Sequence, residues 1–235
     1  FHICNACNAD ACPTIIHDAV QNVFAQAFKN AGCHVVNKPS VEDADGKLLV
    51  PDHLVLGNGT ESGQGLMVDY RHTDSGQTNP LDFSEHMLKS DTEKIGKYNA
   101  AVSRSGHRFM PIILDKFGNV LQKTRDMLFQ MFIRKVSNDR HDITETEADF
   151  IATKKTNFWL KRASAAMAKT KAMCIINRST KLIAIQHEKK HGKGSKNSST
   201  YFDNRIDIEQ ESDVLIADYS FDECNYFKED DDICA

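Results

Sequence analysis

Two short apolar segments that each carry an aspartate constrain this chain more than any other feature of its sequence. Residues 48–56 read Leu-Leu-Val-Pro-Asp-His-Leu-Val-Leu, and residues 65–71 read Gly-Leu-Met-Val-Asp-Tyr-Arg. Runs of Leu, Val and Met bounded by Gly, Asn and Asp turn residues are typical of buried strands. The Gly-rich residues 57–63 predict a hairpin-like connection between them. We therefore expect two neighbouring strands with Asp52 and Asp69 side by side.

The surrounding elements predict an α/β fold. Amphipathic spacing predicts helices over residues 17–31, 83–103 and 120–136, and apolar runs predict strands over residues 33–36 and 108–117. Thr144 and Glu147 have the spacing of a capping box, which opens a long helix running to about residue 177. The order indicates a mixed central β-sheet flanked by helices, with a C-terminal helical extension.

Size and composition indicate one main globular domain. The 235 residues are 40% hydrophobic, enough to fill one sizeable core. No run of about 18 apolar residues occurs, and residues 1–4 lack the features of a signal peptide, so we expect an intracellular protein with no membrane partner. The chain has seven cysteines, an odd number, and they are scattered along the sequence, so we do not expect a disulfide framework.

Charge is divided unevenly along the chain. The net charge is −4, but residues 203–235 hold 12 acidic and 2 basic residues, so residues 1–202 carry +6. A basic body suits a polyanionic partner, and an acidic end is typical of a solvated tail. Residues 187–196, which are basic and contain glycine, predict a flexible linker before that tail.

The two aspartates suggest chemistry on phosphate. Hard divalent cations such as Mg²⁺ bind one or two carboxylates together with substrate phosphate, so the pair predicts metal-assisted phosphodiester hydrolysis. Such a site also needs a cation where charge grows. Arg71 shares a strand face with Asp69, and Lys94, Lys97 and Tyr98 can share one helix face. In the alternative interpretation, the aspartates merely end strands and the lysines are solvated.

The order of these motifs resembles the PD-(D/E)XK nuclease superfamily. It is most similar to the restriction-like endonuclease region that follows the reverse transcriptase in non-LTR retrotransposon proteins. The residues that carry the resemblance span about positions 14–135: Ile16-His17-Asp18-Ala19, Ala31-Gly32-Cys33-His34-Val35, Pro51-Asp52, Val68-Asp69, Lys94, Lys97-Tyr98, His107-Arg108-Phe109-Met110-Pro111 and Phe117-Gly118. The helix around Phe158 and Trp159 also resembles the helix that follows in those proteins.

The resemblance implies a restriction-endonuclease-like core that binds Mg²⁺ or Mn²⁺ and nicks DNA to prime reverse transcription, in a nuclear protein. It assigns Asp52 to the PD motif and Asp69 to the (D/E)XK motif. Arg71 stands where the family has lysine, and Arg cannot act as a base, so Lys94 or Lys97 is expected to compensate. Lys38 stands where related sequences carry Glu, which implies one metal ligand fewer. His17 opens the first helix without the Arg that often precedes it and is expected to position DNA phosphate.

The first residues suggest a separate zinc site. Cys4, Cys7, Cys12 and His17 have the spacing of a retroviral-type zinc knuckle with its last two ligand types exchanged, and four such ligands suit Zn²⁺. Two alternatives remain open. In the first, which the resemblance implies, His2 and Cys4 are the last ligands of a knuckle that begins upstream of residue 1. In the second, the cysteines are reduced and bind no metal.

These observations divide the chain into four segments: a Cys-rich segment (1–16), a nuclease-like core (17–136), a basic helical extension (137–186), and a linker with acidic tail (187–235). The leading hypothesis is a metal-dependent DNA endonuclease of retroelement origin. The second is a catalytically decayed remnant that binds DNA or RNA without cutting. The nucleic-acid contacts expected in either case are His17, Tyr98, Lys161 and Arg162. The third is a protein-interaction domain whose basic helix is ordinary solvated surface.

Overall fold

The computed structural model describes residues 12–57, 64–73 and 80–191 and divides the chain into two units, Phe1–Lys181 and Leu182–Ala235. The first unit is mixed α/β. Its elements are α2 (Cys12–Asn30), β1 (Cys33–Asn37), β2 (Val41–Glu42), β3 (Leu48–Leu49), β4 (His53–Gly57), β5 (Leu66–His72), α3 (Pro80–Arg104), β6 (Arg108–Leu114), α4 (Gln122–Asp139) and α5 (Glu145–His191), the last of which continues into the second unit.

The central sheet has four strands in the order β1-β4-β5-β6, with β2 and β3 forming a separate two-stranded ribbon. Strands β1, β4 and β5 pair antiparallel, and β6 joins β5 in parallel through the crossover helix α3. A mixed sheet flanked by helices was predicted from the order of elements, and this part of the prediction is confirmed.

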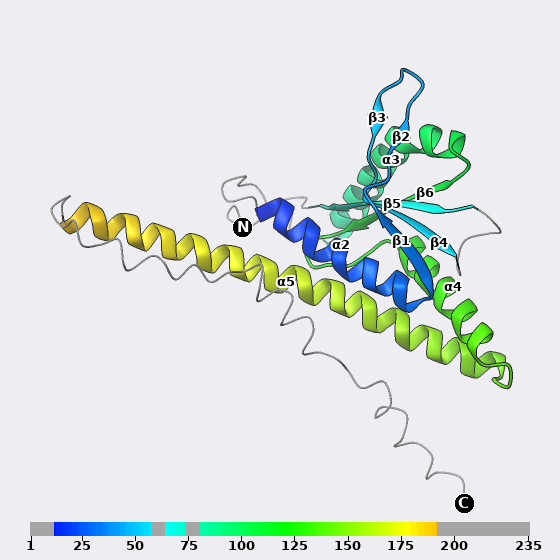
Figure 1. Ribbon diagram of the computed structural model, residues 1–235. Coiled ribbons are helices and arrows are strands. Elements are labelled where there is room, and N and C mark those ends of the chain that lie inside the picture. Colours follow the sequence, from blue (N-terminus) through cyan, green and yellow to red (C-terminus); the bar gives the residue numbers. More distant parts are fainter. Residues whose placement is uncertain (1–11, 58–63, 74–79, 192–235) are drawn as a thin grey trace, which may run out of the picture. The chain divides into compact units, whose positions relative to one another are not determined.

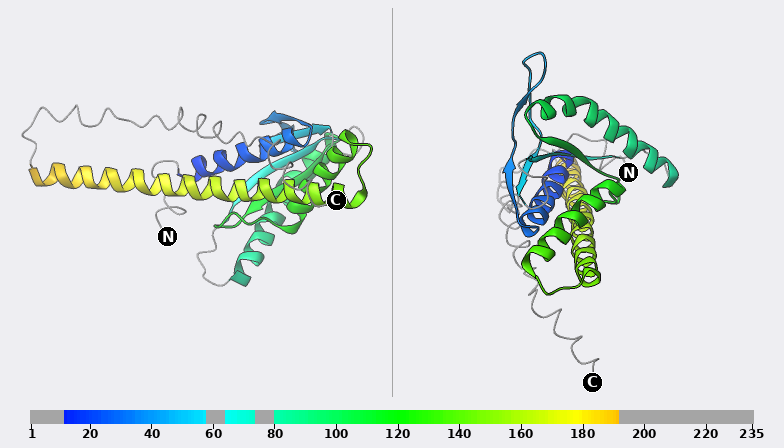
Figure 2. Two further views of the ribbon diagram at one scale, coloured as in Figure 1. Left: turned by 90° about the horizontal axis from the view of Figure 1, so that it is seen from below. Right: turned by 90° about the vertical axis from the view of Figure 1, so that its right-hand side faces the viewer.

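Helices cover both faces of the sheet, as Figures 1 and 2 show. On β5, Leu66, Val68 and Tyr70 face the main core, which is completed by α2, α4 and the first half of α5. Met67 faces the opposite side, where it packs with Tyr98 and Val102 of α3. Because side chains alternate along a strand, Asp69 and Arg71 share the α3 face with Met67.

The segment around Asp52 differs from the prediction. A single strand was expected over residues 48–56, but the chain forms β3, breaks at Val50–Asp52 and then enters β4. Pro51 has no N–H to donate to a ladder, which accounts for the break. Asp52 therefore precedes its strand instead of ending one. The ribbon of β2 and β3 was not predicted, because strands of two residues carry too little pattern.

Helix boundaries also differ from the predicted ones at several ends. Helix α2 begins earlier, at Cys12, with Pro13 in the first turn where proline is tolerated. Helix α5 continues to His191, so residues 187–191 are helical although a linker was expected there. The described helices include none that is long and apolar enough to span a bilayer.

Two local contacts fix the start and the middle of α5. The predicted capping box is present: Glu147 N–H donates to Thr144 Oγ1 at 3.3 Å, and Thr144 N–H donates to Glu147 Oε2 at 3.0 Å. Gly118, at φ +87°, lies so close to α5 that a Cβ there would stand 2.6 Å from Ser164 Cα. Ser164 Oγ donates to the Gly118 carbonyl at 3.0 Å, so α5 is held against the β6–α4 loop.

Candidate functional site

Asp52 is held at the end of the β4–β5 ladder. Its backbone N–H donates to Val68 O at 3.0 Å, and its carbonyl accepts from Lys38 N–H at 2.7 Å. Its Oδ2 accepts from Tyr70 N–H at 2.8 Å, and its Oδ1 lies 3.2 Å from His17 Nε2. The Tyr70 N–H lies beyond the last β4–β5 pair, so the Asp52 carboxylate supplies the acceptor that the ladder no longer offers.

The electrostatics of Asp52 and His17 favour their charged forms. Burial raises the pKa of Asp52, but the hydrogen bonds from His17 and Tyr70 N–H outweigh it, and the net pKa is lowered. The hydrogen bond to Asp52 raises the pKa of His17, and the charge of Asp69 adds to that rise. The first turns of α2 therefore place a histidine against the first aspartate.

Asp69 lies in the middle of β5 and is buried, with 4% of its surface exposed. Its Oδ2 forms an ion pair with Lys94 Nζ from α3. Burial raises the pKa of Asp69, the negative charge of Asp52 raises it further, and Lys94 partly offsets both. Asp69 is thus a desolvated carboxylate whose charge is balanced by the Lys94 ammonium group and by a hydrogen bond from Tyr98.

The end of the β4–β5 ladder brings the two aspartates near each other. The last pair is His53 with Val68, and the Asp52 N–H donates to the carbonyl of the same Val68, which directly precedes Asp69. The charge of Asp52 acts on the pKa of Asp69, and Lys94 acts on both carboxylates. His17 from α2, Asp52 before β4, Asp69 on β5 and Lys94 on α3 therefore form one charged group, which we call the carboxylate cluster.

Lys97 and Tyr98 lie beside this cluster on α3. Lys97 Nζ donates to Tyr98 Oη at 2.9 Å and stands 4.4 Å from the ring centroid. Tyr98 is buried, and burial together with the charge of Asp69 raises its pKa to about 12. Lys94 and Tyr98 thus turn toward the sheet, whereas Lys97 is exposed and lies over the Tyr98 ring.

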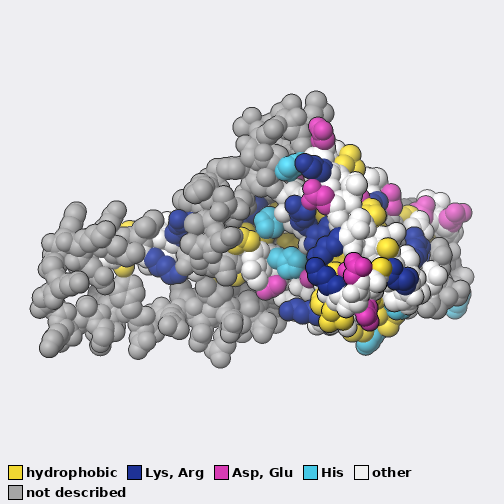
Figure 3. Space-filling view, turned by 90° about the horizontal axis from the view of Figure 1, so that it is seen from above, with side chains coloured by type: hydrophobic (Ala, Val, Ile, Leu, Met, Phe, Trp, Pro, Cys, Tyr) yellow, Lys and Arg dark blue, Asp and Glu magenta, His cyan; other side chains and the backbone are white. Residues whose placement is uncertain are grey.

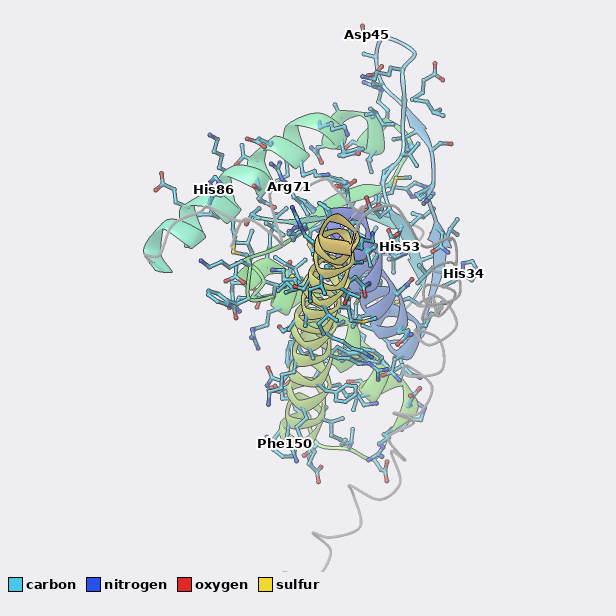
Figure 4. The ribbon with its side chains drawn as sticks, turned by 90° about the vertical axis from the view of Figure 1, so that its left-hand side faces the viewer. His34, Asp45, His53, Arg71, His86 and Phe150 are labelled. Atoms are coloured by element: carbon cyan, nitrogen blue, oxygen red, sulfur yellow. The ribbon has the colours of Figure 1, made fainter. Side chains whose placement is uncertain are left out.

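Arg71 follows Asp69 on the same face of β5 and reaches α3, but its partner is not an aspartate. Its Nη1 donates to Glu93 Oε2 at 2.7 Å, and both side chains are more than two-fifths exposed. Figure 4 shows Arg71 beside α3, and Figure 3 shows Lys and Arg side chains gathered on the face seen from above, with His, Asp and Glu among them. Arg71 lies on the same face of β5 as Asp69, as strand alternation predicted, but its ion pair with Glu93 was not predicted.

A buried polar triad under the cluster was also missed. Gln21 Nε2 donates to His53 Nε2 at 3.4 Å, so His53 Nδ1–H donates to Tyr70 Oη at 2.8 Å. Burial lowers the pKa of His53 to about 4, which keeps it neutral. His53 directly follows Asp52 and Tyr70 directly follows Asp69, so the triad holds the backbone next to both aspartates in place. The signal was present in the sequence: a lone histidine within the apolar run 53–56.

The remaining predicted site residues are placed as follows. Lys161 and Arg162 lie on α5, which contributes no side chain to the carboxylate cluster, and the Arg162 guanidinium stands 5.3 Å from the Trp159 ring centroid. Cys4 and Cys7 lie outside the described residues, as does the side chain of Cys12, so the zinc site stays a prediction. Of the cysteines whose side chains are described, Cys33 and Cys174 form no disulfide.

The carboxylate cluster offers few protein ligands for a metal ion. Within residues 12–57, 64–73 and 80–191, no three or more His, Cys, Asp and Glu side chains are grouped to hold one. The cluster offers two carboxylates, whose oxygens each accept more than one contact. Two carboxylates fit a hard cation such as Mg²⁺, which keeps several waters and takes phosphate oxygens as further ligands.

Comparisons with known proteins give little further information. No family model and no curated protein matches this chain. Among solved structures, an N-terminal domain of a reptarenavirus L protein matches with 15% identity and a TM-score of 0.24, covering 63% of this chain and 73% of that one. A similarity that low carries no argument about function.

Proposed function

We propose that this chain is a metal-dependent endonuclease with a restriction-endonuclease-like core. The observation that carries the proposal is the placement of Asp52 near enough to Asp69 for its charge to act on it, with Lys94 on Asp69 and His17 on Asp52. The order helix, three strands, helix, strand around a mixed sheet agrees with the motif order that resembles PD-(D/E)XK nucleases. By that resemblance the substrate is DNA and the chain derives from a retroelement.

Each residue of the cluster has a role in this proposal. Asp52 and Asp69 would hold Mg²⁺ or Mn²⁺, which when bound makes water a nucleophile near neutral pH and stabilises charge on phosphate. Lys94 brings a positive charge to the carboxylate pair, where the phosphate charge grows during hydrolysis. His17 is a positioning residue, because it holds the Asp52 carboxylate in place together with the Tyr70 N–H.

Two further cations beside the cluster, on β5 and α3, are assigned in this proposal to the phosphates that flank the cut bond. Arg71 is fixed by Glu93, and Lys97 is fixed over the Tyr98 ring. Arg71 cannot serve as a base, so we assign it to phosphate binding by its planar guanidinium. Lys94, which contacts Asp69 directly, takes the place of the family lysine in this assignment.

Plasmid nicking tests the proposal. The full chain is incubated with supercoiled plasmid and Mg²⁺ or Mn²⁺, and open-circle product is measured for the protein and for Asp52→Asn and Asp69→Asn, which keep side-chain size. We expect both substitutions to lower the rate by at least about a hundredfold, while Asp45→Asn at the exposed tip of the β2–β3 ribbon, labelled in Figure 4, leaves it unchanged. Equal nicking by all four proteins would end the proposal.

A second function, nucleic-acid binding without cleavage, is favoured by one observation. Arg71 stands where the family has its lysine, and it pairs with Glu93 at 2.7 Å instead of with the carboxylates. A decayed nuclease would keep the fold and the surrounding basic surface. Salt-sensitive DNA binding with no metal-dependent nicking would select this second function.

A further inference from the structure

The outward face of α5 carries an unusual combination of charge and aromatic rings. Residues 150–181 contain eight Lys and Arg and no Asp or Glu. The inward face is buried in the main core through Ala152, Trp159, Ala163 and Met167. At about 100° per residue, the residues opposite that core fall within an arc of about 120°. Besides Ile151 and Ala168, this arc holds Phe150, Lys154, Phe158, Lys161, Arg162, Ala165 and Lys169, and we call these seven residues the α5 stripe.

Two phenylalanines of the stripe are exposed although α5 has a well-filled core beneath it. Phe150 is 56% exposed and Phe158 is 41% exposed. Each ring has a cation near its face or edge: Lys154 Nζ stands 4.2 Å from the Phe150 centroid, and the Arg162 guanidinium stands 6.0 Å from the Phe158 centroid. The rings are therefore held on the surface by neighbours that also carry positive charge.

We propose that the α5 stripe binds single-stranded nucleic acid, with bases stacked on Phe150 and Phe158 and phosphates on Lys154, Lys161, Arg162 and Lys169. Aromatic rings interleaved with cations are how proteins bind single strands without sequence preference. A duplex hides its base faces, so it can use the cations of the stripe but not the rings. The two rings lie about 12 Å apart along the helix axis, which leaves room for a short run of nucleotides between them.

The stripe is separate from the carboxylate cluster. The cluster is built from α2, β4, β5 and α3, whereas every stripe residue belongs to α5. Figure 4 shows Phe150 well apart from Arg71 and His53. Binding at the stripe is therefore independent of the proposed nuclease activity, and it can be measured in EDTA where no metal-dependent cleavage occurs.

The test measures binding of a fluorescein-labelled mixed-sequence single strand, and of the matching duplex, by anisotropy in EDTA with the full chain. We expect Phe150→Leu and Phe158→Leu each to weaken single-strand binding about tenfold, since one stacked base is worth about 1–3 kcal/mol, and to leave duplex binding unchanged. Replacing Lys154, Lys161 and Lys169 together by Gln is expected to weaken both and to reduce the salt dependence.

Two controls make the outcome decisive. Phe117→Leu changes an exposed ring (62%) on the β6–α4 loop, and Lys47→Gln changes an exposed cation of the β2–β3 ribbon, so neither alters the stripe. Unchanged single-strand affinity in both Phe→Leu variants would overturn the proposal. So would an equal loss for single strand and duplex, or the same loss in the controls. Melting curves of each variant establish that the fold is retained.

Discussion

Replacing Lys94 with methionine tests how the carboxylate cluster is balanced. The change removes the ammonium group from Asp69 and keeps the aliphatic length of the side chain. The side chains of Lys94 and Asp69 are only 19% and 6% exposed, so water screens their attraction weakly. Removing one member of a buried ion pair costs about 3–5 kcal/mol. We expect the lower end, about 3 kcal/mol, because Lys94 keeps some access to solvent.

That loss should be visible in thermal unfolding. For a domain of this size, a loss of about 1 kcal/mol in the free energy of unfolding lowers the melting temperature by about 2–4 °C. The melting temperature of Lys94→Met should therefore fall by about 6–12 °C. The pKa of Asp69 is already raised by burial, and removing Lys94 raises it further. A carboxyl with a raised folded-state pKa destabilises the fold above that pKa and ceases to do so once protonated. The deficit of Lys94→Met should therefore shrink as the pH is lowered.

The assay is a double-mutant cycle followed by circular dichroism, with Lys94→Met, Asp69→Asn and the double variant. In the Asp69→Asn background, where residue 69 is neutral, Lys94→Met should lower the free energy of unfolding much less. The coupling energy between Lys94 and Asp69 should therefore be about 2 kcal/mol or more. Lys89→Met, an exposed lysine on the same helix, is the matched control and should cost under about 0.5 kcal/mol. Strictly additive effects of the two substitutions would refute the reasoning.

Three further predictions concern stability. Burial lowers the pKa of His53 from 6.5 to about 4, so the folded state resists its protonation, and the contribution of His53 to the free energy of unfolding should fall by about 1–2 kcal/mol between pH 7 and pH 5. Because the raised pKa of His17 acts in the opposite direction, the measurement is the difference between urea titrations of the unmodified protein and of His53→Gln, which should change by this amount. Gly118→Ala should cost about 2 kcal/mol or more, because its φ is +87° and its Cβ would overlap Ser164, whereas Gly96→Ala in open helix surface should be neutral or stabilising in the same calorimetric assay. Thr144→Ala should cost about 1 kcal/mol by removing the α5 cap, and an unchanged melting temperature would show that the cap contributes nothing.

Much of the fold could be predicted from periodicity. Strands β1, β5 and β6 and the helices around them have a spacing or apolar content that one segment reveals alone. The ribbon of β2 and β3 could not be predicted, because its strands of two residues are held by pairing across a turn. The break at Pro51 was readable in principle, since proline cannot donate to a ladder, but the flanking apolar residues outweighed it in the prediction.

The candidate site was predictable where it depended on strand ends and helix spacing. Asp52, Asp69 and Lys94 came from such patterns, and the structure brings them together. The contact of His17 with Asp52 joins residues 35 positions apart, and that of Arg71 with Glu93 joins residues 22 apart. Contacts at such separations follow from tertiary packing and have no signature in one sequence.

Calorimetric titration with Mn²⁺ tests the central claim most directly, because it asks whether Asp52 and Asp69 hold one divalent cation together. The account predicts a single site in the unmodified protein that is lost or weakened at least tenfold in Asp52→Asn and in Asp69→Asn, and kept in Asp45→Asn. Equal binding by all four proteins, or no Mn²⁺ binding by the unmodified protein, would contradict it.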